Sequence, residues 1–204
     1  MYRIDHNNYH QKPKNSTIYT PPAVSQFIFN LLQDKVKKGT ILDPCSGQGS
    51  LLTPWKEVGY LTWGIDIDPI SNADAKMDFF ACQPYASEWN DEMNLVLCNP
   101  PFNGYGKKLG SEVWLAKIIE LFGQDIPIVL FVPVGFRLNL TLASQRYLKF
   151  ANGEYPEIKS SITLPKNIFA GVEFHSEILI FNIPNLQAHY FFSPTSQIEQ
   201  RTPI

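Results

Sequence analysis

The sequence predicts an α/β fold in which a mostly parallel, doubly wound sheet carries helices on both faces and ends in a late antiparallel hairpin. Short apolar runs at 40–43, 61–67, 95–98 and 126–134 are interleaved with helix-like segments, a pattern typical of parallel sheets covered by helices. Two later apolar runs, 161–165 and 177–183, have no long helix between them. They are therefore expected to pair as a hairpin at one edge of the sheet.

The spacing of apolar side chains predicts the helices. Residues 22–36 carry apolar residues three and four positions apart, and Gly39 with the two lysines before it closes that helix. Residues 50–58 predict a second helix, in which Pro54 would cost about 3 kcal/mol at an interior position, so this helix should either start near Thr53 or kink there. Residues 112–122 and 140–151 predict two further helices.

Composition excludes several classes of protein. The chain has 204 residues, 44% of them hydrophobic, which fits a single domain over 1–204 with a flexible polar arm at 1–16. Its three cysteines and four histidines lack metal-ligand spacing, so no metal site is expected, and the odd cysteine count favours a cytoplasmic protein without disulfides. No apolar stretch is long enough to span a membrane. A net charge of −2 gives no overall indication of nucleic-acid binding.

Two strand ends predict a nucleotide-like ligand. Gly47 and Gly49 follow the run that ends at Asp43, and glycines at such a turn let the backbone approach a ligand closely, although a simple tight turn has the same signature. Asp66 ends the next strand about 20 residues later, where an acid in these folds bonds ribose hydroxyls. Together they favour an adenosine-containing ligand.

The missing motifs narrow the choice of ligand. A third glycine of the dinucleotide fingerprint is absent after Gly49, and no Gly-Lys-Ser/Thr stretch is present to bind phosphates. Asp43 would suit an ammonium group. These features predict S-adenosylmethionine as the cofactor.

The stretch Asn99-Pro100-Pro101-Phe102 follows an apolar run and has a chemical logic beside a methyl donor. The Asn99 amide carbonyl and the Pro100 backbone carbonyl are two acceptors that can hold the N–H groups of an aromatic amine and draw its nitrogen toward tetrahedral geometry. Phe102 offers a ring on which a planar base can stack. An ordinary strand-ending turn has similar composition, so that alternative stays open.

These motifs resemble the S-adenosylmethionine-dependent amino-methyltransferases. NPPF at 99–102, with DPCSGQG at 43–49, GIDID at 64–68 and KMDFF at 76–80, matches their signatures, and YTPPAVSQFI at 19–28 looks like the gamma class of DNA adenine-N6 methyltransferases. The resemblance runs from Tyr19 to Ile183. It implies a Rossmann-like class I methyltransferase fold and methyl transfer to the 6-amino group of adenine in DNA.

The resemblance also implies roles for individual residues. Asn99, Pro100, Pro101 and Phe102 would be catalytic, and Phe102 and Phe169 would stack on the target base, although Phe174 lies only five residues beyond Phe169. The cofactor site would comprise Thr20, Pro21, Pro22, Asp43, Cys45, Ser46, Gly47, Gly49, Asp66, Ile67, Asp78, Phe79 and Asn99. Within it Asp66 would hold the ribose, and Asp78 would bond the adenine amino group.

The chain departs from the family at its carboxyl end, where only about 20 residues follow the last predicted strand and no separate target-recognition domain is expected. Recognition would then come from loops at 103–112 and 152–161 or from a partner subunit, as in restriction-modification complexes. Ribosomal-RNA guanine or adenine methyltransferases and protein glutamine methyltransferases share the motif and remain alternatives. A non-catalytic subunit that binds S-adenosylmethionine in a modification complex is a further one.

Overall fold

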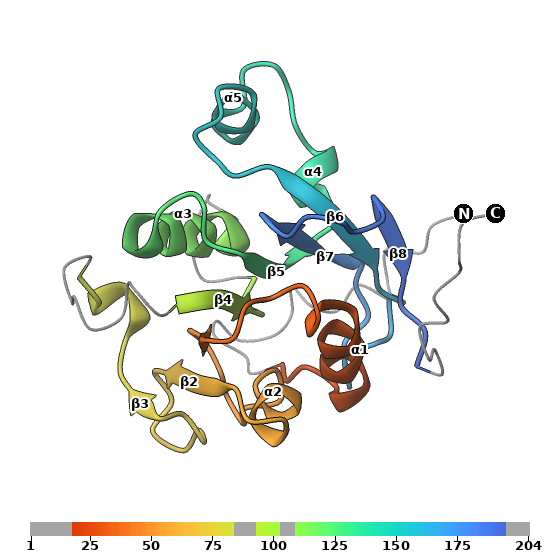
Figure 1. The fold of residues 1–204 in the computed structure, drawn as a ribbon. Helices are drawn as coiled ribbons and strands as arrows, with labels where there is room; N and C mark the ends of the chain where they lie inside the picture. The colour runs from red at the N-terminus through yellow and green to blue at the C-terminus, as the bar shows by residue number, and fades with distance from the viewer. Residues whose placement is uncertain (1–17, 84–92, 103–108, 195–204) are drawn as a thin grey trace.

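The structure, a computed structural model, describes residues 18–83, 93–102 and 109–194. Its centre is an eight-stranded sheet with the order β3-β2-β1-β4-β5-β7-β6-β8 (Figure 1). The strands are β1 (Thr40–Asp43), β2 (Leu61–Asp66), β3 (Ala75–Lys76), β4 (Met93–Cys98), β5 (Ile128–Pro133), β6 (Ile158–Thr163), β7 (Ser176–Phe181) and β8 (His189–Phe191).

The strand directions confirm the predicted mixed sheet. β3, β2, β1, β4 and β5 run parallel to one another, whereas β7 pairs antiparallel with both β5 and β6. The hairpin lies one strand inside the edge rather than at it, because β8 pairs parallel with β6 beyond the hairpin. The sequence did not predict β8, which has only three residues, two of them exposed, and so lacks the apolar run by which the other late strands were found.

The helices follow the predicted segments with shifted ends. They are α1 (Pro22–Leu32), α2 (Thr53–Glu57), α3 (Gly110–Phe122), α4 (Gly135–Leu138) and α5 (Gln145–Ala151), with a short 3₁₀ helix, η3 (Phe79–Ala81). α2 begins at Thr53 with Pro54 in its first turn, as expected from the cost of an interior proline.

Two predicted helix boundaries were wrong. α1 ends at Leu32 instead of Val36, and the next residues continue as a turn in which the Val36 N–H donates to the Leu32 carbonyl. α5 begins five residues later than expected. The Thr141 N–H donates to Ser144 Oγ over 2.8 Å, and this side-chain bond replaces the helical pattern at 141–144.

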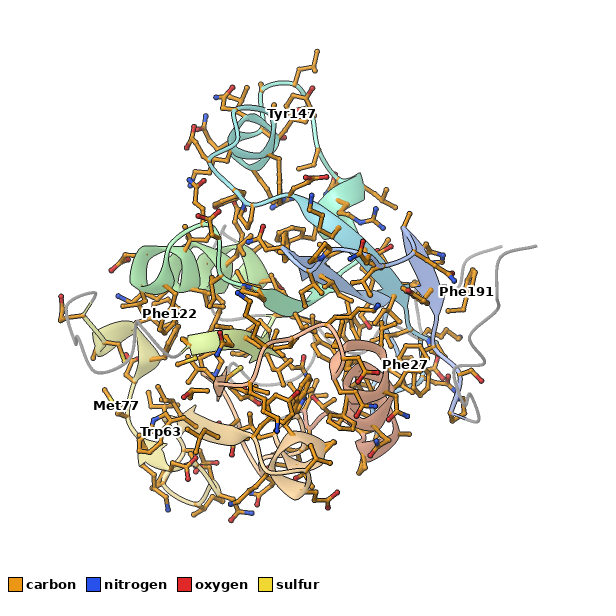
Figure 2. All side chains as sticks on the ribbon, in the orientation of Figure 1. Phe27, Trp63, Met77, Phe122, Tyr147 and Phe191 are labelled. Atoms are coloured by element: carbon orange, nitrogen blue, oxygen red, sulfur yellow. The ribbon has the colours of Figure 1, made fainter. Side chains whose placement is uncertain are left out.

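Alternate side chains along the strands belong to two hydrophobic cores, one on each face of the sheet. Ile41, Leu95 and Leu97 pack with α1 and α2, whereas Leu42 and Val96 pack with α3. In Figure 1, α1 and α2 lie below the sheet and α3 and α5 above it. Figure 2 shows side chains filling both layers, while Tyr147 on α5 lies at the upper end of the molecule, away from the sheet.

This arrangement determines where a site can form. The parallel strands β2, β1 and β4 end at one edge of the sheet, so that Asp66, Asp43 and Asn99 follow neighbouring strands there. The order of the strands reverses between β1 and β4, which is the place where doubly wound folds bind ligands. Within the described ranges, no helix is long and apolar enough to cross a membrane.

Candidate active site

A cavity of about 590 Å³ opens at this edge of the sheet. Most of the predicted site residues line it: Thr20, Asp43, Cys45, Ser46, Gly47, Asp66, Ile67, Asp78, Phe79, Asn99, Pro100, Pro101, Phe102 and Phe169. Pro21, Pro22 and Gly49 do not line it, although Pro21 and Gly49 are each adjacent in sequence to a residue that does, and Pro22 begins α1 directly after Pro21. Residues as far apart in the sequence as Thr20 and Phe169 thus converge on one cavity.

The turn after β1 is built around two glycines with positive φ. Gly47 has φ +50°, and a Cβ on it would lie 2.9 Å from Cε1 of Tyr19, so a larger residue would be strained and would displace the tyrosine ring. The Gly47 N–H donates to Asp66 Oδ2 over 2.7 Å. This bond fixes the glycine turn against the end of β2.

Three carboxylates and one amide lie in a row along the cavity. Asp78 follows β3, Asp66 ends β2, Asp43 ends β1 and Asn99 follows β4, and these four strands are consecutive in the sheet. With strands about 4.8 Å apart, the row spans roughly 14 Å. Asp68 adds a fourth carboxylate to the wall, and no lysine or arginine occurs among the described lining residues. The cavity therefore suits an extended ligand that carries positive charge.

Asp43 is a buried carboxylate with a raised pKa. Its side chain is 2% exposed, and this burial raises the pKa of Asp43 to about 7, with a smaller raising effect from the charge of Asp66. The Cys45 N–H donates to Asp43 Oδ1 over 3.1 Å and opposes the shift. A cation bound beside Asp43 would restore its ionised form.

Asn99 is held by a residue from the other end of the chain. Its Nδ2 donates to Thr20 Oγ1 over 2.9 Å. Among the described residues, no hydrogen bond reaches Asn99 Oδ1 or the carbonyl oxygen of Pro100. Both oxygens are thus available as acceptors for an incoming amine.

Three phenylalanines form the wall beside Asn99. Phe174 contacts Phe102 edge to face, with ring centroids 5.1 Å apart, and stacks on Phe169 at 5.6 Å. Phe169 is 2% exposed and also packs against Phe131 in the core. The assignment of Phe169 to the target base therefore stays a prediction, and Phe174 is the ring that touches Phe102.

Sequence reasoning missed several lining residues. Tyr19 and Asp68 lie within the matching stretches 19–28 and 64–68 but were assigned no role, and Ser50 directly follows the glycine turn. Trp114 reaches the cavity from α3, where helical spacing predicts only core packing. Residues 103–108, which include Lys107 and Lys108 and belong to the loop predicted to take part in recognition, lie outside the described residues.

Comparison with known families identifies the first part of the chain. A family model described as N-6 DNA Methylase matches residues 2–80, which include the glycine turn, Asp66 and Asp78. Residues 2–80 are thus similar to the N-6 DNA methylases. The resemblance predicted from the sequence motifs is thereby confirmed. No curated protein sequence matches the chain.

Solved structures confirm the class I methyltransferase fold predicted for this chain. A Listeria monocytogenes protein assigned to the class I S-adenosylmethionine-dependent methyltransferases superposes with a TM-score of 0.62 at 16% identity, covering 87% of this chain and 67% of that one. The type I restriction-modification methyltransferase subunit of Streptococcus thermophilus gives 0.59 at 21% identity, covering 85% and 47%. The M protein of the type I enzyme EcoKI gives 0.57 at 13%, covering 82% and 44%. The chain spans less than half the length of these two type I proteins.

S-adenosylmethionine is the cofactor of this fold class, and the cavity fits it. The cofactor carries a sulfonium and an ammonium, and the described wall supplies four carboxylates and no basic side chain. About 590 Å³ is within the range of small-molecule sites. No cluster of three metal-ligating side chains occurs within the described parts of the chain.

Proposed function

We propose that this protein transfers a methyl group from S-adenosylmethionine to the 6-amino group of adenine in DNA. One observation carries the proposal: Asp78, Asp66, Asp43 and Asn99 follow consecutive strands. With the cofactor lying along this edge of the sheet, the first three residues would meet its adenine, ribose and methionine parts in that order. The fourth would meet the target amine. The family match over residues 2–80 supports adenine as the base and DNA as the polymer.

The chain's own residues have distinct tasks in this reaction. When bound, S-adenosylmethionine supplies an electrophilic methyl group. Asn99 Oδ1 and the Pro100 carbonyl accept the two N–H groups of the target amine, so the nitrogen lone pair turns out of the ring plane toward the methyl group. Neither oxygen is a strong base. The residues therefore orient and electrostatically stabilise the amine, and its surplus proton passes to water after the methyl group has been transferred.

A base in a duplex cannot reach a cavity of this kind, so the target adenine must turn out of the stack. Phe102 provides a ring beside Asn99 against which the extruded base can stack, an interaction worth about 1–3 kcal/mol. Phe169 or Phe174 would close the opposite side. The cost of unstacking is offset by this contact and by the two hydrogen bonds at the amine.

The alternatives differ in substrate or in activity. An RNA base or a glutamine amide presents a similar amine to the same two acceptors, and Asn99 alone does not separate them. The family match favours DNA over both. Against a non-catalytic subunit, the two acceptor oxygens have no competing partner among the described residues.

Sequence recognition is proposed to come from a partner subunit in a restriction-modification complex. A type I restriction-modification protein, whose solved structure is described as explaining complex assembly, superposes with a TM-score of 0.60 and is covered over only 42% of its length. The near-neutral net charge of −2 also supports a partner, because phosphate contacts supply most non-specific DNA affinity. A cytoplasmic location accords with three free cysteines.

The deciding experiment measures which polymer becomes labelled. The purified protein, and cells that produce it, are supplied with methyl-labelled S-adenosylmethionine, and DNA, RNA and protein are digested and analysed by mass spectrometry. N6-methyladenine in DNA, absent with Asn99→Ala, is expected. Label in ribosomal RNA or in glutamine side chains would contradict the DNA assignment.

A further inference from the structure

A chain of hydrogen bonds leads from α1 to the Asn99 amide. Ser25 Oγ and Ser50 Oγ lie 3.1 Å apart, and Ser50 Oγ donates to the carbonyl oxygen of Thr20 over 2.6 Å. Thr20 Oγ1 in turn accepts from Asn99 Nδ2 over 2.9 Å. The four residues come from three separate segments, so the chain joins α1, the turn after β1 and the loop after β4.

The direction of the hydroxyl protons follows from counting donors. Ser50 has one hydroxyl proton, which is committed to the Thr20 carbonyl at the shortest distance in the chain, so Ser25 must donate to Ser50. The other acceptor near Ser25 Oγ is the Pro21 carbonyl, 3.5 Å away, which already accepts the N–H groups of Val24 and Ser25. Ser25 is 1% exposed and needs such a partner.

Within this chain of hydrogen bonds, Ser50 is the residue that fixes the position of Thr20. Thr20 lies outside any helix or strand, and Ser50 is the one described donor to its carbonyl oxygen. The Thr20 hydroxyl belongs to the same residue as this carbonyl. Its position therefore depends on the hydrogen bond by which Ser50 holds the main chain of Thr20. An amide has two nearly isosteric ends, and the end that faces a substrate is decided by what holds the other end.

We propose that Ser50 is a positioning residue for methyl transfer: by holding Thr20, it keeps the NH₂ end of the Asn99 amide engaged and leaves Oδ1 to the target amine. This inference rests on the proposed function, since it assigns Asn99 Oδ1 to an amine. Ser50 acts through Thr20 and Asn99 and does not itself touch the reacting atoms. It also couples the cofactor turn, in which Ser50 follows Gly49, to the geometry of the acceptor.

The test uses three variants of the full chain. Ser50→Ala removes the donor, and Ser50→Thr keeps a hydroxyl. Thr53→Val is the control, because the exposed Thr53 Oγ1 donates to the Gly49 carbonyl over 3.0 Å in the same turn but takes no part in the hydrogen-bond chain. Loss of one hydrogen bond predicts a fall in kcat of about five- to tenfold for Ser50→Ala. The Kd of S-adenosylmethionine should stay within about twofold. Ser50→Thr should recover at least about half of the lost turnover, and Thr53→Val should equal wild type.

Each possible result decides the proposal. A Ser50→Ala kcat within twofold of wild type would overturn it, and so would a cofactor affinity that falls as far as turnover, because Ser50 would then be a cofactor ligand. Turnover is measured with labelled S-adenosylmethionine on DNA and on RNA in parallel. Label in RNA alone would overturn the DNA assignment while the variant ratio still tests Ser50. Cofactor binding without label in either polymer would overturn both.

Discussion

Phe174 stands between Phe102 and Phe169, with its ring centroid 5.1 Å from the first and 5.6 Å from the second. A planar base sandwiched between two rings needs them about 7 Å apart, twice a stacking contact. The space between Phe102 and Phe174 is therefore too narrow for a base in this conformation. A base that enters there has to displace Phe174, whereas Phe169 is held in the core by Phe131.

This geometry predicts different effects for two otherwise matched substitutions. Phe174→Leu should raise the KM for the methylated polymer about fivefold or more, because it removes ring contact with the base. Phe169→Leu should leave that KM within about twofold and lower the free energy of unfolding by about 1–3 kcal/mol, because the smaller side chain leaves the core less well filled. Steady-state kinetics and denaturant unfolding of both variants check this. If Phe169→Leu raised the KM more than Phe174→Leu does, the result would favour Phe169 as the ring that stacks on the target base.

Asp66 is expected to determine cofactor affinity. It accepts bonds from the Gly47 N–H and the Asp68 N–H, so its carboxylate is fixed before a ligand arrives. Asp66→Ala should weaken binding of S-adenosylmethionine by about 1.5–3 kcal/mol, the value of hydrogen bonds to a charged partner. Calorimetry measures the loss. Asp34→Ala, which lies outside the cavity, is the control, and equal affinity of all three proteins would rule out the ribose assignment.

Asp43 should make cofactor binding depend on pH. Its pKa near 7 is above the unfolded value, so its contribution to stability is complete at low pH and is lost as the pH rises toward 7. Above pH 7 the ionised carboxylate meets the ammonium of the cofactor. The affinity of wild type for S-adenosylmethionine should therefore increase between pH 6 and pH 8, by at most about tenfold per pH unit.

Asp43→Asn is the matched variant for this test, since Asn keeps the shape and an acceptor for the Cys45 N–H. Its affinity should vary little with pH over the same interval. The difference in unfolding free energy between the variant and the free wild type should also grow up to about pH 7 and then level off. Parallel pH profiles for the two proteins would show that Asp43 does not titrate in this range.

The sequence was sufficient to predict which residues meet at the cavity, because many of them lie at a strand end with a recognisable neighbour. Asp43 and Asp66 follow apolar runs, and strand direction alone brings them to one edge. It could not predict that Phe174 rather than Phe169 contacts Phe102, because both aromatic residues lie on one short segment and their order in space depends on its turn. Gly171, with φ +71°, shapes that turn.

Other features escaped prediction because they depend on contacts distant in sequence. The hydrogen bond between Asn99 and Thr20 joins residues 79 apart and has no pattern in either motif. β8 is too short to show alternation, and it forms only because β6 offers an edge for it. The raised pKa of Asp43 likewise needs the burial that the assembled sheet supplies.

Asn99 gives the sharpest separation of catalysis from binding. If Oδ1 accepts from the target amine as the nitrogen becomes tetrahedral, the bond strengthens toward the transition state, and Asn99→Ala should lower kcat far more than cofactor affinity. A loss of about 10²-fold or more is expected for a preorganised acceptor of this kind. Asn99→Asp keeps an acceptor of the same shape, and Thr20 Oγ1 can turn its proton to donate to the carboxylate, so partial activity is expected. Rapid-quench measurement of a single turnover, with cofactor Kd measured beside it, separates the two effects. Wild-type turnover in Asn99→Ala would mean that residues 99–102 form only a strand-ending turn.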